Sequence, residues 1–177
     1  MRRRALIAGL LLAPVAARGQ DARWQAIVSR DLRFRLEMPA PAQASVAGEV
    51  EKGHAGPRHA WSAKLDNEMF DFDHVDYQPG ALAQRDSKAA ARELGRGEAE
   101  KAFPPAKFKY LRDEPALLQG FDGYALDIAD GDGAVVVMRT WIVRDRLYRL
   151  LATHRGDLRS ASAAQRFVDS LKLAESR

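Results

Sequence analysis

Residues 124–154 contain the stretch that decides the fold, YALDIADGDGAVVVMRTWIVRDRLYRLLATH. The run 134–143 within it is almost entirely apolar, which predicts a central β-strand covered on both faces. The preceding DGDG segment at 130–133 is typical of a tight hairpin turn, because Asp-Gly pairs accept the positive φ angles that such turns need. Flanking strands are predicted at 124–129 and 147–154. Three consecutive strands joined by short turns indicate an antiparallel sheet.

The N-terminal half carries weaker strand patterns of the same kind. Leu32–Met38 alternates apolar and charged residues, which predicts a half-buried strand. Pro39 and Pro41 are expected to end it, because proline cannot donate a ladder hydrogen bond. Further strands are expected at 24–28, 43–52, 58–65 and 107–111, the middle two forming a hairpin around Gly53–Pro57.

Met69–Tyr77 is predicted to be another strand, with Phe70 and Phe72 inward and Asp71 and Asp73 outward.

Within the strand predicted at Met69–Tyr77, His74 and Asp76 share a face and offer one imidazole and one carboxylate to a metal ion. One such pair is not a complete site. The favoured interpretation is a solvated strand face with a histidine near the sheet edge. The Asp127, Asp130 and Asp132 cluster is better explained by a hairpin turn than by calcium, because apolar residues follow at once. No metal and no cofactor are therefore expected.

Two helices complete the predicted architecture. The composition of Ala81–Phe103 favours a helix that Gly95 and Gly97 break or fray. Ser162–Gln165 matches a capping box and predicts the start of a second helix. Strands, helix, strands and helix in that order indicate an α+β fold, a mainly antiparallel sheet packed between or against helices.

The first nineteen residues have the layout of a secretory signal peptide. Met1–Arg4 is basic, Ala5–Ala13 is apolar, and Ala17–Gly19 has small residues where a signal peptidase cleaves. The apolar run is shorter than the roughly 20 residues that a membrane-spanning helix needs. We therefore expect cleavage before Gln20, and a periplasmic or secreted protein. The arginines also permit the twin-arginine route, although general secretion is favoured.

Removal of this leader changes the charge of the chain. The full sequence of 177 residues has 28 lysines and arginines against 24 acidic residues. Four of the arginines lie in the leader, so residues 20–177 carry equal numbers of basic and acidic groups. That balance argues against nucleic-acid binding. The length suits one domain. The absence of cysteine excludes disulfides, thiolate metal sites and a lipid-anchored N-terminal cysteine, so no stable membrane anchor is expected.

Three patches resemble a known family. They are FRLEMP at 34–39, RLYRL at 146–150 and RFVDSLKL at 166–173. Together they resemble small exported bacterial domains of the PsbP-like type, a fold found in an extrinsic subunit of photosystem II. The resemblance implies a PsbP-like sandwich, with an antiparallel sheet between helices, and a non-enzymatic accessory or binding role. Many bacterial members are lipoproteins, whereas this chain lacks the required cysteine. No functional residues carry over from the family.

Catalytic signatures are absent from the sequence, so no catalytic residue is predicted. No serine stands in a Gly-x-Ser-x-Gly surround, and there is no phosphate-binding glycine loop. A hydrolase whose residues meet only in space remains the alternative, because triads are defined by geometry. Trp61 and Trp141 are expected to pack in the core or on a sheet face.

Arginines recur near the end of the chain, at positions 139, 144, 146, 149, 155 and 159. On adjacent strands they form a potential cationic patch for an anionic lipid, glycan or acidic partner. The predicted ligand-binding residues are Arg144, Arg146 and Arg149. Ordinary solvated surface arginines are the alternative. The sequence as a whole indicates an exported, non-catalytic binding or accessory protein, monomeric or a small homo-oligomer, with an envelope protein or a small anion as its partner.

Overall fold

The computed structural model describes residues 24–49, 55–82, 85–102, 108–155 and 158–174. The predicted leader lies outside these residues. The strands are β1 (Trp24–Val28), β2 (Phe34–Pro39), β3 (Gln43–Glu49), β4 (Ala55–Leu65), β5 (Glu68–Tyr77), β6 (Phe108–Leu118), β7 (Phe121–Asp130), β8 (Ala134–Val143), β9 (Arg146–Arg155) and β10 (Lys172–Leu173). The helices are α1 (Ser87–Ala102) and α2 (Leu158–Asp169). Among the described residues, no helix has the length and apolar character needed to cross a membrane.

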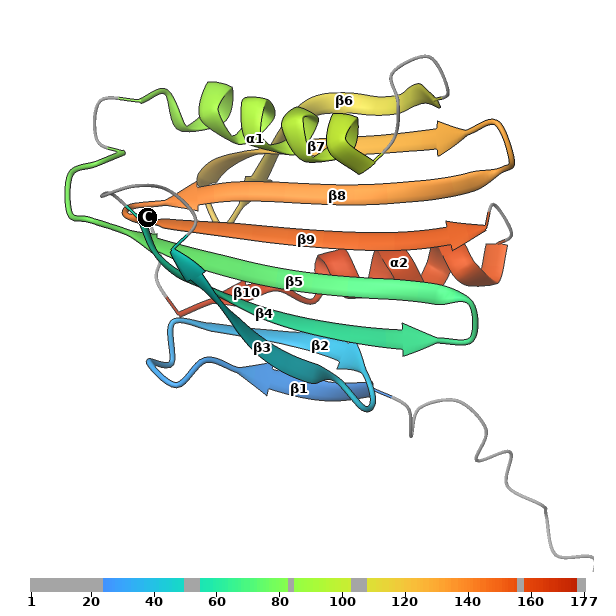
Figure 1. The fold of residues 1–177 in the computed structure, drawn as a ribbon, viewed down its shortest axis with the longest axis horizontal. Helices are drawn as coiled ribbons and strands as arrows, with labels where there is room; N and C mark the ends of the chain where they lie inside the picture. The colour runs from blue at the N-terminus through green and yellow to red at the C-terminus, as the bar shows by residue number, and fades with distance from the viewer. Residues whose placement is uncertain (1–23, 50–54, 83–84, 103–107, 156–157, 175–177) are drawn as a thin grey trace, which may run out of the picture.

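The strands form two antiparallel sheets, and the predicted α+β class is confirmed (Figure 1). The larger sheet has seven strands in the order β3-β4-β5-β9-β8-β7-β6, and the smaller has the order β1-β2-β10. The strand predicted as central, β8, has the predicted bounds and pairs with β7 and β9. Its last eight residues are all buried, as expected of a strand that is covered on both faces.

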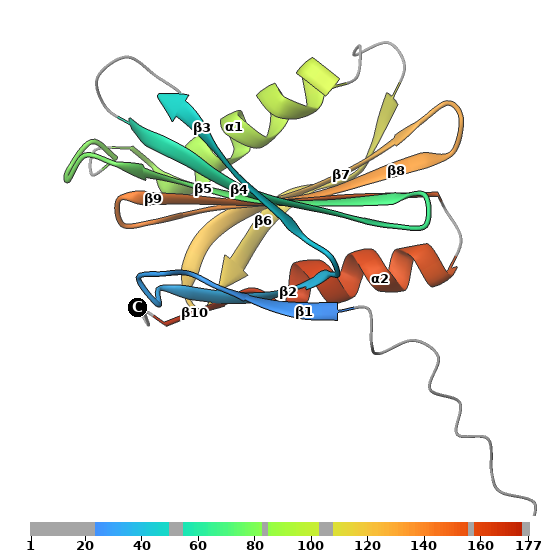
Figure 2. The ribbon, with the colours of Figure 1, turned by 60° about the horizontal axis from the view of Figure 1, so that its bottom comes forward.

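The two faces of the seven-stranded sheet are covered by different elements. Figure 2 shows α1 on one face, and α2 with the small sheet on the other. The face toward α2 and the small sheet carries the largest apolar cluster, which includes Phe34, Phe72, Tyr148, Leu150 and Phe167. The face toward α1 carries two smaller clusters built from alanine and aliphatic residues.

Helix α1 is more continuous than its sequence predicts. Asp86 accepts hydrogen bonds from the backbone N–H groups of Lys88 and Ala89, so it caps the helix and sets its start at Ser87. The helix then runs through Gly95 and Gly97, so the predicted break is wrong. Its packing on β7 and β8 explains this, because tertiary contacts outweigh the modest helix propensity lost at glycine.

The predicted start of α2 is also wrong. The helix begins at Leu158, so Ser162 lies inside it and is not a capping residue. At the other end, the Ser170 hydroxyl donates to the Phe167 carbonyl and accepts from the backbone N–H of Glu37. One small side chain therefore closes the helix and ties it to β2.

The environment of β5 corrects two further expectations. Strand β5 lies between β4 and β9, so His74 is not near the sheet edge, and it is buried. Phe70 and Phe72 point into the large cluster as predicted. Asp73 points to the opposite face as predicted but is also buried, because α1 covers that face.

Both edges of the seven-stranded sheet are irregular. The β3–β4 register shifts between Ala47 and Glu49, and the β6–β7 register shifts between Tyr110 and Arg112. Pro115 lies within β6, where the missing N–H is tolerated because β6 is an edge strand.

Candidate functional site

The structure does not bring the three predicted ligand-binding arginines together. Arg144 is exposed in the β8–β9 turn, where its φ is 55°. Arg146 and Arg149 are both on β9 and both buried, but their ion-pair partners lie on opposite faces of the sheet. Their shared role in anion binding therefore stays a prediction.

Arg149 belongs to a charged network beneath α1. Its guanidinium contacts Asp73 at 2.9 Å and Glu98 of α1 at 3.2 Å. Arg58 of β4 contacts the same Asp73 oxygen at 2.8 Å. One buried carboxylate thus pairs with two arginines, one from each strand beside β5. Arg149 also pairs with Glu98 and so connects this cluster to α1.

Arg146 lies on the other face and joins the two sheets. Its Nε donates to Asp76 of β5 at 2.5 Å, and its Nη2 donates to Asp31 at 2.7 Å, in the loop between β1 and β2. Desolvation opposes ionisation of Asp31, but hydrogen bonds from Arg146, Ser29 and the Arg33 backbone outweigh it and hold its pKa below the ordinary value. Burial likewise favours the neutral form of Asp76, but the hydrogen bond from Arg146 outweighs it, so the pKa of Asp76 is also lowered.

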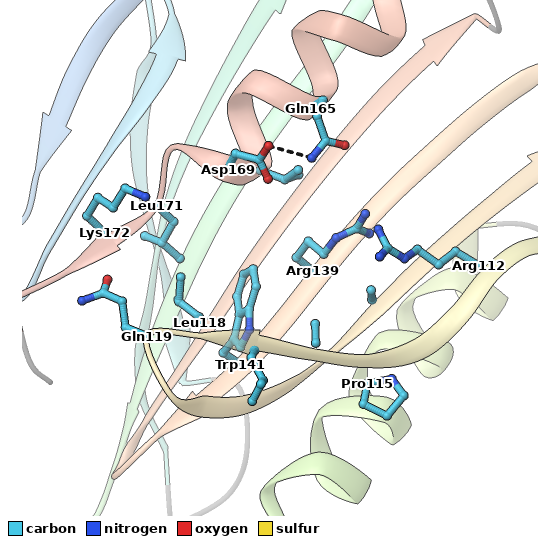
Figure 3. Close-up of a pocket in the computed structure, with 14 residues that line it drawn as sticks. Arg112, Pro115, Leu118, Gln119, Arg139, Trp141, Gln165, Asp169, Leu171 and Lys172 are labelled. Atoms are coloured by element: carbon cyan, nitrogen blue, oxygen red, sulfur yellow. Dashed lines mark hydrogen bonds between the residues drawn. The ribbon is translucent and has the colours of Figure 1, made fainter. Parts of the chain in front are cut away.

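One pocket, here called the hairpin pocket, lies between the β6–β7 hairpin and α2, with a volume of about 670 Å³ (Figure 3). Its lining includes Arg112, Arg139, Lys172, Asp169 and Trp141. The lining residues therefore contribute three cations and one carboxylate, and Asp169 accepts a 2.7 Å hydrogen bond from Gln165.

Two arginines converge in the hairpin pocket. Figure 3 shows the guanidinium ends of Arg112 and Arg139 pointing toward one another. Both arginines lie beside Asp127. Asp127 is opposite Arg112 in the β6–β7 register, and its carboxylate accepts a 2.5 Å hydrogen bond from Arg139. Arg112 also contacts Glu114 at 2.6 Å. Neither Asp127 nor Glu114 lines the pocket, so the lining presents the cations.

Trp141 is buried as predicted and also lines the hairpin pocket. Its ring is accommodated because the cross-strand neighbour is Gly123, where an added Cβ would overlap the indole and the Thr140 carbonyl oxygen. Its indole N–H has no hydrogen-bond partner among the described residues. The sequence gives no signal for this pocket, because its residues come from β6, β8 and the α2–β10 region and meet only on folding.

Another pocket, here called the histidine pocket, lies beside Arg146 and has a volume of about 440 Å³. Its lining includes His59, Trp61 and His74 from β4 and β5, together with Asp31 and Arg146. The rings of His59 and His74 stack with centroids 5.0 Å apart, and Trp61 stacks on His74 at 5.8 Å. Burial and then the adjacent charge of Arg146 lower the pKa of His74 to about 4, so the ring is neutral near pH 7.

The candidate metal ligands and Ser170 are engaged in structural contacts. The described part of the chain holds no group of three or more histidine, aspartate or glutamate side chains placed to bind one metal ion. His74 and Asp76 are separated from such a role because Asp76 already pairs with Arg146. The Ser170 hydroxyl is engaged in the β2–α2 junction.

Comparisons with known proteins bear on the fold. No family model matches the sequence, and no curated protein matches it. Among solved structures, the chain is similar to cyanobacterial PsbP (CyanoP) from Synechocystis sp. PCC 6803, with a TM-score of 0.59 and 12% sequence identity. The match covers 91% of this chain and 99% of the cyanobacterial one. The expected resemblance is therefore confirmed at the level of the backbone, and the chain has a PsbP-like fold.

Proposed function

We propose that this protein is an exported, non-catalytic binding or accessory protein of the bacterial cell envelope, and that its hairpin pocket receives an anionic group of its partner. The observation that carries the proposal is the convergence of Arg112 and Arg139 in a pocket that Trp141 also lines. The PsbP-like fold and the accessory role that the resemblance implies are consistent with it.

The convergence favours an anion on electrostatic grounds. Two guanidinium groups that face each other repel, and an oxyanion between them replaces that repulsion with charge-assisted hydrogen bonds. Arg139 is held almost rigidly by Asp127 and by the Met138 carbonyl. Arg112 is half-exposed and pairs with the exposed Glu114, so it can adjust toward a bound group, and Lys172 adds a third cation at the rim. A fixed and an adjustable guanidinium together suit planar, bidentate recognition of a carboxylate or phosphate.

The cellular part of the proposal rests on the sequence. The basic start, the short apolar run and the small residues at 17–19 support export and cleavage before Gln20, leaving one mature domain of residues 20–177. Mass spectrometry of protein recovered from the periplasm tests this part. A mature mass beginning at Gln20 supports it, and a retained leader contradicts it.

Titration with inorganic phosphate tests the anion site directly. We expect saturable binding that weakens as salt rises, because the rim cations are exposed and screened. The Arg112→Gln variant should bind about tenfold more weakly, the loss expected for one charge-assisted hydrogen bond. Arg35→Gln is the matched control, because it removes an exposed arginine of β2 outside the pocket. Equal weakening in both variants would show that only net charge matters and would contradict the site.

Two additions to that titration separate the other candidates. Arg144→Gln tests the predicted turn arginine, and a loss of phosphate affinity there would favour the anion-binding alternative based on Arg144, Arg146 and Arg149. Assays with nitrophenyl esters and phosphates test the hydrolase alternative. A reproducible turnover that one point substitution abolishes would overturn the non-catalytic assignment.

A further inference from the structure

The histidine pocket is independent of the hairpin pocket and has a different chemistry. It opens where the loop after β1 meets strands β3, β4 and β5 of the large sheet. Its volume of about 440 Å³ is within the usual range for small-molecule sites. Val28 and Val46 form an exposed apolar rim around the polar interior.

The pocket carries no net charge. Its charged lining residues are Arg30, Asp31, Asp76 and Arg146, two of each sign. Asp31 and Asp76 are both bonded to Arg146, and His74 is neutral near pH 7. A charged ligand gains little in such a site, because it meets equal numbers of like and opposite charges. The balance favours a neutral ligand.

Two polar atoms on side chains that line this pocket are buried without a partner. Arg146 Nη1 and His74 Nδ1 have no hydrogen-bond partner among the described residues, and both side chains are more than nine-tenths buried. A buried polar atom left unpaired is destabilising, so such atoms on the side chains that line a ligand-sized pocket point to a bound group. Arg146 Nη1 requires an acceptor oxygen, whereas a neutral imidazole nitrogen pairs with an N–H group or an acceptor according to its tautomer.

The aromatic rings define the shape of the ligand. The His59 and His74 rings are inclined by only 17°, and Trp61 and His74 by 27°. The three side chains therefore form a nearly parallel tier, which favours the stacking of another flat ring.

We propose that the histidine pocket binds a neutral, planar heterocycle of the cyclic-amide type, stacked on the tier of His59, Trp61 and His74. Its ring carbonyl accepts from Arg146 Nη1, and the adjacent ring N–H donates to His74 Nδ1. This ligand fits the flat tier, the zero net charge and the two unpaired buried atoms together.

The test is a titration of the purified protein with uridine, followed by the indole and imidazole NMR signals. We expect saturable shifts of the Trp61 and His74 signals with a dissociation constant of about 1 mM, as befits a single ring with two hydrogen bonds. The Trp24 signal should not move, because Trp24 does not line the pocket. 3-Methyluridine, which keeps the ring and carbonyls but lacks the N–H, should bind about fivefold more weakly.

A matched pair of variants tests the residues. His74→Phe keeps a flat ring and removes Nδ1, so it should weaken uridine binding about fivefold, whereas Met69→Gln on the same strand should not change it. If His74→Phe fails to fold, the comparison of uridine with 3-methyluridine in the unaltered protein still decides. The absence of saturable shifts, equal affinity for the two nucleosides, or equal affinity for ribose alone would overturn the proposal. Phosphate binding in the hairpin pocket is measured on the same samples, so failure of one site is distinguished from failure of the other.

Discussion

The two faces of the seven-stranded sheet are stabilised by different interactions. The face toward α2 and the small sheet is aromatic, with Phe34, Phe72 and Tyr148 in mutual ring contact. The face toward α1 is built from alanine and aliphatic residues around charged groups, in particular the Arg58–Asp73–Arg149–Glu98 network. The same strands supply both faces, because alternate side chains point to opposite sides.

This difference indicates a division of roles. Aromatic burial is non-directional and large, so the first face should supply most of the free energy of folding. Buried ion pairs recover little net energy after desolvation, but their geometry is specific. We therefore expect the second face to determine where α1 lies on the sheet and to contribute less to stability.

Phe72→Ala should have the largest effect on stability. Phe72 is fully buried, and its ring centroid lies 4.8 Å from that of Phe34. Removing the ring leaves a cavity and should cost about 3–5 kcal/mol in the free energy of unfolding. Urea denaturation measures this loss. A cost below about 1 kcal/mol would show that this face is not the dominant core.

Asp73→Asn should have the next largest effect, a loss of about 2–4 kcal/mol in the free energy of unfolding. The substitution leaves two arginines without their shared buried carboxylate. The double variant Asp73→Leu with Arg149→Met replaces the pair by apolar side chains and should recover at least half of that loss. Urea denaturation of both variants checks the prediction. If the double variant is less stable than Asp73→Asn, the network contributes net energy and the contrast between the faces is smaller than inferred.

Acidification should destabilise the protein through His74, which lies on the aromatic face. The unfolded chain takes up a proton near pH 6.5, whereas the folded chain does so only near pH 4. The free energy of unfolding should therefore fall by up to about 3 kcal/mol as the pH drops from 6.5 to 4. Burial, Arg146 and His59 lower this pKa, while Asp76 and Asp31 oppose them. The pKa values of those two carboxyls are themselves lowered, so their effects begin below about pH 4.

His74→Phe is the control for this pH dependence. Urea denaturation at a series of pH values should show a flatter profile between pH 6.5 and 4 in the variant than in the unaltered protein. Identical slopes would assign the effect to other groups.

Gly97→Ala should have the smallest effect and the opposite sign. An added Cβ at Gly97 of α1 meets no atom within 4 Å, so it should stabilise the helix by about 0.5–1 kcal/mol. A rise of a few degrees in the melting temperature would agree with this. A decrease would indicate that the α1 face needs a flexible helix, and would weaken the assigned positional role.

The sequence predicts the regular parts of this fold well. The apolar run 134–143 and the DGDG turn locate β7, β8 and β9, because alternation and turn chemistry are local properties. Strand order is not local, so the sequence alone places His74 near a sheet edge and Asp73 toward solvent, and both predictions are wrong. An aspartate within an alternating strand predicts an exposed face unless a distant helix covers it, and α1 does so here.

The candidate sites were less predictable than the fold. Arg146 was singled out from its sequence, but its acidic partners are 70 and 115 residues away along the chain. Arg112 and Arg139 belong to strands that are both paired with β7, so their convergence depends on two registers at once. A single sequence contains no signal for such a meeting.

The irregular edges of the large sheet have a consequence for self-assembly. A strand from a second molecule can extend a sheet only where the edge offers a continuous row of N–H and C=O groups. Pro115 removes one donor from β6, and register shifts interrupt the ladders of both β3 and β6. Such bulges bend an edge away from a flat partner. The protein should therefore resist joining into fibrils at high local concentration, although most of its described chain is β-strand.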